Sequence, residues 1–492
     1  MSKWLGRLRL EPCPRAQALS ARWTARAAAA SAVLVLIVPV GLDVAAWAES
    51  ARACRAVRAH VFRLKLAHGV VYAEQKGKHL FLQPTTPDWM VVNENGAILL
   101  SRCDGAPVEK VLGDAGESLG EQARALFTEA LARGLLVDLS TSRLGKAPEV
   151  ARPAQREDRQ PLGMVHLKLT NQCNLHCSYC YAESGQGAAV LSWGELERIA
   201  LEVATISPSV AYVLSGGEPL LHPSAIDFAE AMRAAGNSVH LLTNGTLINE
   251  LNVRRIAAAA NVVKISLDGS SERIHAATRG VGNFARATRA IDLLLACGAN
   301  VMVAMTVTRA NCRDIPAMVE RYGERLALQP LFKAGRSSGS NDLTLSGLEY
   351  HRALQAVDGV APMGGVDAKL KSLRGRGVRR CAMAEREISI AETGDVYPCQ
   401  LLYDDRFLAG NVRKQSVGEI YADSQVFARM REVSVDTLAK CSSCAVRYLC
   451  GGACRARDRF EVGSEELVGE FCAYEREALL NGIFDSVAMR TV

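Results

Sequence analysis

Residues 165–180 read VHLKLTNQCNLHCSYC, a stretch with leucine and valine at alternate positions followed closely by Cys173, Cys177 and Cys180. The stretch is typical of a buried strand, so the cysteines fall on the loop that follows it. Three thiolates at this spacing can face one point from a tight loop, but a structural zinc site requires a fourth ligand. A [4Fe–4S] cube held by three thiolates instead leaves one iron free for an exogenous ligand. Chance clustering, or a zinc site that takes a ligand from elsewhere, is the alternative.

From residue 163 onward the sequence alternates between predicted strands and helices. The stretches with buried-strand composition are 165–170, 211–214, 238–243, 262–267, 300–308 and 327–332. Helical patterns lie between them, and Ser192 and Glu195 have the spacing of a capping box. Six such units in sequence predict an α/β fold, a parallel sheet curled into a partial (β/α)6 TIM-like barrel. Ligands are then expected at the carboxyl ends of the strands.

Small and polar residues follow three of these strands in order. Glycine lets backbone approach a small ligand, and a carboxylate can accept a hydrogen bond from an ammonium group. Each motif alone is typical of a turn, but their repetition at successive strand ends predicts a binding site. The candidate residues are Ser215, Gly216, Gly217, Glu218 and Pro219, then Thr243 and Asn244, then Ser266 and Asp268, with Arg279 further on.

The loop from Cys173 to Cys180, with Tyr179 before its last cysteine, resembles the signature of the radical S-adenosylmethionine superfamily. The resemblance implies that the amine and carboxylate of this cosubstrate chelate the free iron. It also implies that an electron from the cluster breaks a carbon–sulfur bond and releases a 5′-deoxyadenosyl radical. By the same resemblance, residues 215–219 contact the methionine amine. Ser266 and nearby polar groups hold the ribose or the carboxylate, and Arg279 pairs with the carboxylate.

Seven further cysteines lie between residues 381 and 472. A zinc ribbon built on Cys441 and Cys444 is one interpretation. Seven thiols exceed one zinc site, and two such sites would need eight. Two iron–sulfur clusters, one fully ligated and one with a vacancy, would use all seven.

The cysteine spacing resembles the twin-cluster SPASM domain of peptide-modifying radical enzymes. The resemblance implies an inner cluster on Cys381, Cys399 and Cys454 and an outer cluster on Cys441, Cys444, Cys450 and Cys472. Many relatives have a further cysteine where Arg386, Glu387 and Ile388 stand here. The fourth inner ligand is therefore open, supplied by substrate, or supplied by another side chain.

Residues 68–140 are predicted to form a winged-helix-like unit. A hairpin at 69–82 leads to a turn at 94–96, a short helix after Gly105, and a helix at 121–133 that Gly134 ends. The run 92–99 resembles the small peptide chaperone of pyrroloquinoline quinone biosynthesis. That resemblance implies binding of the leader of a ribosomal precursor peptide as an added strand. A plain structural appendage is the alternative.

The expected organisation has seven parts. They are an N-terminal extension with an apolar segment at 1–67, the leader-binding unit at 68–140, a linker at 141–162, the barrel at 163–336, a bridge at 337–380, the cluster domain at 381–475 and a C-terminal helix or tail at 476–492. The extension has a basic stretch, an apolar run at 27–40 and a signal-peptidase-like Ala46-Trp47-Ala48. Because cluster thiolates need a reducing compartment, we expect a cytoplasmic protein, with membrane association the lesser alternative.

Charge and the remaining cysteines carry less information. The 58 basic and 52 acidic residues form no dense basic stripe with interleaved aromatics, which disfavours nucleic acid as a partner. The cysteines outside the two groups are expected to be buried or incidental. They are Cys13, Cys54, Cys103, Cys297 and Cys312.

Together these features predict an oxidoreductase-type radical enzyme with three [4Fe–4S] clusters and S-adenosylmethionine. Its predicted substrate is a ribosomal precursor peptide, crosslinked or oxidised, and its electron donor a reductase, ferredoxin or flavodoxin. Two other enzyme classes fit the cysteines: a sulfatase maturase that generates formylglycine, and an enzyme that modifies tetrapyrrole side chains. The non-enzymatic alternative is a zinc-bearing, DNA-binding regulator. No catalytic acid or base is identifiable.

Overall fold

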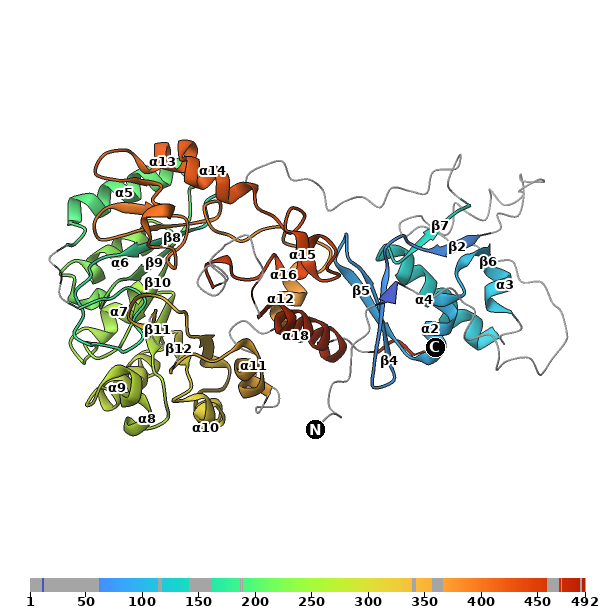
Figure 1. The fold of residues 1–492 in the computed structure, drawn as a ribbon, viewed down its shortest axis with the longest axis horizontal. Helices are drawn as coiled ribbons and strands as arrows, with labels where there is room; N and C mark the ends of the chain where they lie inside the picture. Colours follow the sequence, from blue (N-terminus) through green and yellow to red (C-terminus); the bar gives the residue numbers. More distant parts are fainter. Residues whose placement is uncertain are drawn as a thin grey trace, which may run out of the picture. The chain divides into compact units, whose positions relative to one another are not determined.

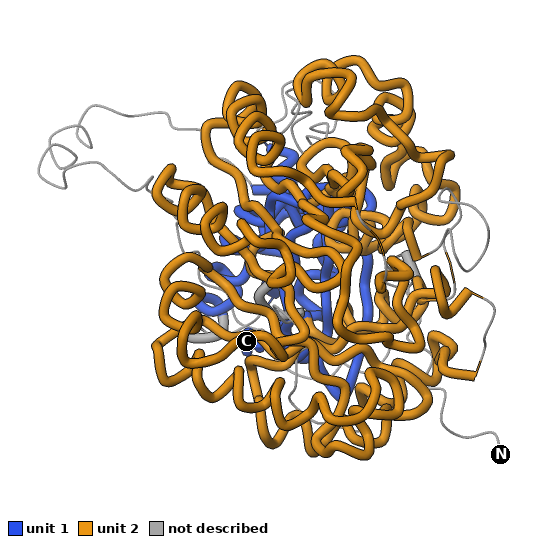
Figure 2. Tube along the Cα trace, turned by 90° about the vertical axis from the view of Figure 1, so that its left-hand side faces the viewer, with its two compact units in different colours: residues 1–154, 374–377, 483–492 blue, residues 155–373, 378–482 orange. Residues whose placement is uncertain are grey.

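A computed structural model describes residues 11–12, 62–113, 117–140, 161–185, 187, 189–338, 342–355, 366–457, 469, 471–486 and 489–491. The chain divides into two compact units, coloured separately in Figure 2. Unit 1 comprises residues 1–154, 374–377 and 483–492, and unit 2 comprises residues 155–373 and 378–482.

Unit 2 is built on a curled parallel sheet (Figure 1). Its first six strands are β8 (Met164–Lys168), β9 (Ala211–Ser215), β10 (Ser238–Thr243), β11 (Val262–Ser266), β12 (Val301–Val307) and β13 (Leu326–Pro330). Each is hydrogen-bonded in parallel to the next along the chain. The predicted strands and the predicted partial barrel are confirmed. The carboxyl ends of all six strands therefore meet at one edge.

Helices follow the strands. They are α5 (Trp193–Ile206), α6 (Ala225–Ala234), α7 (Val253–Ala259), α8 (Glu272–Arg279), α9 (Phe284–Ala296) and α10 (Ile315–Tyr322), with short 3-10 turns η2 (Pro219–Leu221), η3 (Cys312–Asp314), η4 (Gly323–Arg325) and η5 (Gly335–Ser337). The predicted capping box is present, because Ser192 accepts from the Glu195 backbone while the Glu195 side chain accepts from the Ser192 backbone. Such a cap stabilises a helix start by about 1 kcal/mol.

The sheet continues beyond the barrel into the cysteine-rich segment. Strand β14 (Glu387–Ile390) pairs in parallel with β8, and β15 (Asp395–Tyr397) and β16 (Gly410–Asn411) follow in antiparallel pairing. Ile388 and Ile390 are fully buried and join the hydrophobic core of the barrel. The segment around Cys381 and Cys399 is thus anchored to the strand that precedes the first cysteine loop.

The remaining elements after the barrel are helical. They are α11 (Gly347–Gln355), α12 (Val366–Leu373), η6 (Asp405–Phe407), α13 (Val417–Asp423), α14 (Gln425–Glu432), α15 (Ala439–Ser442), α16 (Arg447–Cys450) and α18 (Phe471–Ser486). The predicted helix near 345–357 corresponds to α11.

In its described residues, unit 1 contains two antiparallel sheets and three helices. One sheet has the order β1-β3-β4-β5 and the other β6-β2-β7. Their strands are β1 (Glu11–Pro12), β2 (Arg63–Leu66), β3 (Val71–Gln75), β4 (Lys78–Gln83), β5 (Asp88–Val92), β6 (Asp104–Pro107) and β7 (Leu136–Asp138). The predicted hairpin is β3–β4, and Gly134 has the predicted left-handed φ of 67° after the third helix.

The helices of unit 1 correct one prediction. They are α2 (Glu94–Ser101), α3 (Val108–Leu112) and α4 (Glu117–Ala132). The predicted turn at 94–96 is instead the first turn of α2. The Asn93 side chain accepts from the Gly96 backbone at 3.0 Å and caps the helix. The aliphatic residues after Gly96 then favour helix over a hairpin turn.

Two sequence segments far from the N-terminal region complete unit 1. The Arg374 guanidinium lies 2.8 Å from Asp88 Oδ1 and 4.6 Å from the centre of the Trp89 ring. Lys78 Nζ donates to the Phe484 carbonyl at 2.7 Å. The apolar run at 27–40 and most of the linker lie outside the described residues. Within the described part of the chain, every helix is too short or too polar to span a bilayer.

Candidate active site

The loop after β8 places three thiols on one cavity wall. Cys173, Cys177 and Cys180 all line a cavity of about 490 Å³. Burial raises the pKa of the Cys173 thiol to about 11, and the nearby Cys177 and Cys180 thiolates add to the rise. The loop is held by backbone bonds, among them Cys173 N to Gly185 O at 3.2 Å. The structure therefore brings the predicted thiols together.

Two arginines contact this loop, Arg279, which is buried, and Arg336, which is half-buried. Arg279 Nη1 lies 4.0 Å from Cys177 Sγ, and the Arg279 guanidinium stacks over the Tyr179 ring at 5.4 Å. Arg336 donates to the carbonyls of Cys177 and Ser184, both at 2.8 Å. Burial raises the pKa of Cys177, whereas the charges of Arg279 and Arg336 lower it. The two guanidinium groups thus offset negative charge that gathers when the thiols ionise.

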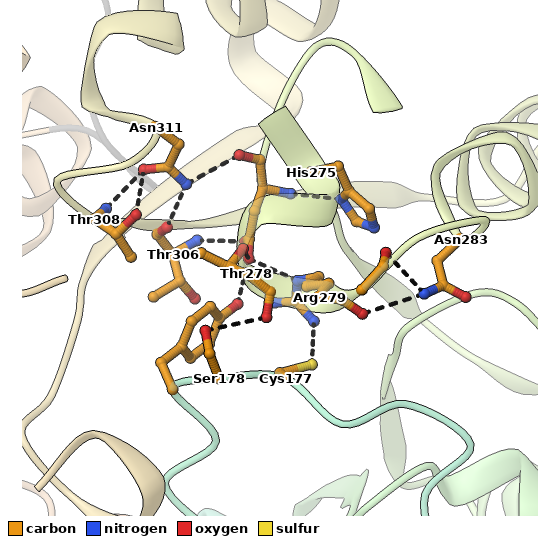
Figure 3. Close-up of polar contacts among 12 residues, drawn as sticks. Cys177, Ser178, His275, Thr278, Arg279, Asn283, Thr306, Thr308 and Asn311 are labelled. Carbon is orange, nitrogen blue, oxygen red and sulfur yellow. Dashed lines mark hydrogen bonds and ion pairs between the residues drawn. The ribbon is translucent and has the colours of Figure 1, made fainter. Parts of the chain in front are cut away.

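A buried network fixes Arg279, and Figure 3 shows it reaching Cys177. Asp268 has no exposed side chain and accepts from Arg279 Nε at 2.8 Å and from Tyr179 Oη at 2.5 Å. His275 Nδ1 lies 3.1 Å from the Asp268 backbone nitrogen and accepts from it. Asn311 donates to the carbonyls of Asp268 and Thr306, both at 2.9 Å. The loops after β11 and β12 are thereby tied to the cysteine loop.

The predicted cosubstrate residues fall into two groups. Those that line the cavity are Ser215, Gly216, Gly217, Thr243, Asn244, Ser266 and Arg279. Those that are not among its lining residues are Glu218, Pro219 and Asp268. Contact of this second group with the cosubstrate stays a prediction, and their described contacts are with the protein.

Glu218 illustrates the difference. Its side chain is fully buried and accepts from Thr243 Oγ1 at 2.7 Å, from Asn244 N at 2.8 Å and from Leu220 N at 3.2 Å. Burial raises its pKa to about 7, against the lowering effect of these hydrogen bonds. Glu218 therefore joins the ends of β9 and β10 and positions the cavity-lining Thr243 and Asn244.

Gly216 and Gly217 are required by close backbone approach. A Cβ on Gly217 would lie 2.1 Å from the Gln172 carbonyl oxygen, and one on Gly216 would lie 2.4 Å from that of Thr170. Gly216 also has a φ of 142°. The loop after β9 is thus pressed against the start of the cysteine loop, where a side chain could not fit.

Sequence reasoning missed several cavity residues. Arg336 follows the last barrel strand without a recognisable motif, although its position at a strand end was a usable signal. Lys264 and Thr306 point inward from β11 and β12, where strand alternation could have suggested them. The missed lining residues also include Gln329, Gln400 and Arg457.

The seven cysteines between residues 381 and 472 influence one another's pKa in two groups. Burial raises the pKa of Cys399, and Cys381 and Cys454 are among the further causes. Burial likewise raises the pKa of Cys441 to about 11, with added effects of Cys450, Cys472 and Cys444. Electrostatic coupling within each set indicates that its members are neighbours. The ligand roles themselves stay a prediction.

The residues fit clusters better than a single ion. Within the described ranges, no three His, Cys, Asp or Glu side chains converge on a point suited to one metal ion. A [4Fe–4S] cube binds each thiolate to a different iron, so its ligands need not converge. The cavity wall supplies three thiols as ligands for such a cube, and Arg279 and Arg336 line the same cavity.

The other cysteines lie apart from these sets. Cys103 is buried in unit 1, where burial raises its pKa to about 12. Cys297 is exposed and Cys312 is half-buried. Cys13 and Cys54 fall outside the described residues.

Each of the two cysteine-containing regions matches a known protein family. The profile of the radical SAM superfamily matches residues 167–321, and that of an iron–sulfur cluster-binding domain, SPASM, matches residues 381–445. Mycofactocin maturase MftC of Mycobacterium ulcerans is 31% identical over 315 residues, 60% of this chain and 83% of that protein. The chain belongs to the radical SAM superfamily. As a member of it, the protein is an enzyme that uses iron–sulfur clusters and S-adenosylmethionine.

This radical SAM enzyme is also similar to a second curated protein and to a solved structure. The AdoMet-dependent heme synthase of Methanosarcina barkeri is 27% identical, over 63% of this chain and 96% of that protein. The structure of Streptococcus suis SuiB bound to precursor peptide SuiA has a TM-score of 0.52 at 15% identity. It covers 83% of this chain and 99% of SuiB, more than residues 161–492 alone could supply. The fold likeness therefore extends into the N-terminal unit.

Proposed function

We propose that this radical SAM enzyme modifies a ribosomal precursor peptide whose leader binds to unit 1. The observation that carries the proposal is the presence, on one chain, of the thiol-lined cavity and of a unit whose sheet pairs at both outer edges with short segments. When bound, the cluster and S-adenosylmethionine supply a 5′-deoxyadenosyl radical able to abstract hydrogen from a side chain. The relative named as a maturase and the fold likeness to a peptide-bound enzyme support this substrate class.

Both outer edges of the β3–β4–β5 sheet pair with short segments of unit 1. Residues 11–12 pair with Val71 and Tyr72 at the edge of β3. At the edge of β5, Asn93 N donates to Arg490 O at 3.1 Å and Arg490 N donates to Val91 O at 3.0 Å. A leader segment can form the same backbone bonds by replacing one of these short segments.

The chain's own residues prepare the cavity for one substrate side chain. Arg279 and Arg336 hold the cysteine loop, and Glu218 positions the ends of β9 and β10. Pockets of about 300–1,000 Å³ hold one drug-sized ligand. The cavity of about 490 Å³ falls within this range.

Tetrapyrrole modification is the second candidate, because the heme synthase aligns over nearly its whole length. That alignment leaves more than a third of this chain unmatched. The alignment with the maturase leaves a similar share unmatched, so the preference for a peptide rests on the role proposed for unit 1 and on the fold likeness to SuiB over that unit.

We further propose a cytoplasmic location and a ferredoxin, flavodoxin or reductase as the electron donor. Cluster thiolates require a reducing compartment, and reductive cleavage requires a one-electron donor. Replacement of dithionite by reduced flavodoxin should then sustain formation of 5′-deoxyadenosine.

The test uses the full chain, reconstituted anaerobically, with S-adenosylmethionine and short peptides encoded beside its gene. The expected result is a peptide that has lost two hydrogen atoms, detected by mass spectrometry, and tighter binding of the whole precursor than of its leaderless form. The Cys177→Ala variant is the control and should leave the peptide unmodified. Modification of an added tetrapyrrole, with every peptide unchanged, would contradict the proposal.

A further inference from the structure

The inner auxiliary site has one thiol fewer than a cube has irons. Cys381, Cys399 and Cys454 form this set, whereas the outer set has four cysteines. In a fully ligated [4Fe–4S] cluster, four protein side chains each bind one iron. A fourth ligand would be another side chain that faces the inner thiols.

The residues that follow Cys381 face in different directions. Arg386 is exposed to solvent. Ile388 is fully buried in the hydrophobic core of the barrel. Because side chains alternate along a strand, Glu387 at the start of β14 projects to the face opposite Ile388. The Glu387 side chain is 19% exposed, so it lies largely within the protein.

The backbone brings Glu387 back beside the cysteines. The nitrogens of Arg386 and Glu387 both donate to the Ala382 carbonyl, at 2.9 and 3.0 Å. Ala384 N donates to the Pro398 carbonyl at 3.0 Å, and Ala384 has a left-handed φ of 61°. This tight loop joins the neighbour of Cys381 to the neighbour of Cys399, with Glu387 at its end.

Electrostatics agrees with this geometry. Burial raises the pKa of Cys399, and the Glu387 carboxylate is the next cause of the rise. Glu387 also raises the pKa of Cys381, after burial. One carboxylate thus lies near enough to act on two thiols of the same set.

A histidine orients the carboxylate. His166 Nε2 lies 3.2 Å from Glu387 Oε1, and the His166 side chain is 6% exposed. His166 belongs to β8, the strand that pairs with β14. Metal-bound carboxylates are commonly held in this way by a second hydrogen-bonding group, which fixes the oxygen that faces the metal.

We propose that Glu387 is the fourth ligand of the inner auxiliary cluster, bound to iron through a carboxylate oxygen. The inner cluster then has no vacant iron. Its role is to relay electrons, and a substrate thiol or amide does not bind to it. The proposal rests on membership of the radical SAM superfamily and is independent of the peptide substrate.

The test isolates the auxiliary clusters in full-length protein. A parent variant with Cys173, Cys177 and Cys180 changed to Ala lacks the ligands of the catalytic cluster. To it are added, one at a time, Glu387→Ala, Glu387→Cys and the matched control Glu385→Ala, which removes a carboxylate from the same loop. Iron content, the electron paramagnetic resonance spectrum and the midpoint potential are measured after anaerobic reconstitution.

The parent and the control should hold about eight irons with identical spectra. Glu387→Ala should lose about one iron per chain and show the oxidised-state signal of a [3Fe–4S] cluster. Glu387→Cys should keep about eight irons, with an altered spectrum and a lower potential, because thiolate donates more charge to iron than carboxylate. Added 2-mercaptoethanol should leave the spectrum of the parent unchanged, because its inner cluster has no vacant iron.

Three outcomes would overturn the proposal. One is a Glu387→Ala or Glu387→Cys variant with the iron content, spectrum and potential of the parent. The second is a parent spectrum that responds to 2-mercaptoethanol as a vacant iron would. If Glu387→Ala lost the whole inner cluster and Glu387→Cys did not restore it, Glu387 would be needed for the loop and not as a ligand. Restoration by Glu387→Cys would support the proposal.

Discussion

Arg279 is the residue on which the geometry of the cysteine loop depends. It pairs with fully buried Asp268 and reaches Cys177 Sγ. Removal of one partner leaves the other as an uncompensated buried charge, at a cost of several kcal/mol. The pair therefore behaves as one unit.

We expect Arg279→Met to lower the free energy of unfolding by about 3 kcal/mol. Asp268→Asn in the same chain should restore at least about 1 kcal/mol of it, because the buried carboxylate is then gone. Urea unfolding under anaerobic conditions measures both values. If the changes in free energy of unfolding caused by the two substitutions were strictly additive, Arg279 and Asp268 would not be energetically coupled.

His275 makes the same network sensitive to acid. Burial lowers its pKa to about 4, and the Arg279 charge adds to the shift. A histidine that is neutral in the fold contributes stability above its unfolded pKa of about 6.5, and this is lost as the pH falls toward 4. Protonation would also remove the acceptor for the Asp268 N–H.

Between pH 7.5 and pH 5.5 the wild type should therefore lose about 1 kcal/mol relative to His275→Asn, which keeps an acceptor and does not titrate. Urea midpoints of the two proteins at both pH values measure the difference. A difference that does not change with pH would show that His275 titrates normally.

For single residues, the sequence identified which side chains belong to the site better than it identified where those side chains lie. The cysteines and the polar strand ends were predictable, because spacing and order are visible in one dimension. That Glu218 and Asp268 lie behind the cavity wall was not predictable, since their partners Asn244 and Tyr179 are distant in sequence. Arg336 gave no motif, because its contacts are with backbone carbonyls.

Among the loops, η5 acts as a support for the cysteine loop. Gly335, at its start, has a φ of 56°, and a Cβ there would lie 2.4 and 2.5 Å from the carbonyl oxygens of Tyr181 and Cys180. The next residue, Arg336, donates its backbone N–H to Cys180 O at 3.1 Å. The cysteine loop and η5 can pack only if position 335 lacks a side chain.

We predict that Gly335→Ala displaces the cysteine loop and costs the enzyme its catalytic cluster, a loss of about four irons per chain. Gly323→Ala is the matched control, because Gly323 also has a positive φ, of 50°, but nothing lies within 4 Å of its added Cβ. Iron analysis after anaerobic reconstitution distinguishes them. Equal iron content in the two variants would contradict the role of η5.

Elements with strong local signals were predicted well, and those set by distant pairing were not. The barrel strands are rich in aliphatic residues, and the start of α5 has its capping box. Strand β14 was not foreseen, because a four-residue strand is specified by its pairing with β8 more than by its composition. The turn expected at 94–96 became part of α2 because Asn93 caps a helix there.

For the whole molecule, the discontinuous unit 1 limits what a linear reading can predict. It also includes residues 374–377 and 483–492, which follow the barrel in the chain. The likeness to SuiB extends over this N-terminal region as well as over the barrel. The resemblance of unit 1 to a peptide chaperone rests on a short motif. The binding of a leader peptide by unit 1 stays a proposal.

The total iron content follows from the cysteine sets of the whole chain. We expect about twelve irons per chain in the reconstituted enzyme and about eight after Cys173, Cys177 and Cys180 are changed to Ala. Parallel zinc analysis should find little zinc in either protein. Two or three zincs in place of iron would contradict the assignment of the cysteines.

The central claim is that the three thiols of the loop after β8 hold a cube whose fourth iron binds S-adenosylmethionine. The most direct measurement is the electron paramagnetic resonance spectrum of the dithionite-reduced enzyme before and after addition of S-adenosylmethionine. The account predicts a changed spectrum in the wild type and an unchanged one in the variant that lacks Cys173, Cys177 and Cys180. A wild-type spectrum that does not respond to S-adenosylmethionine would contradict it.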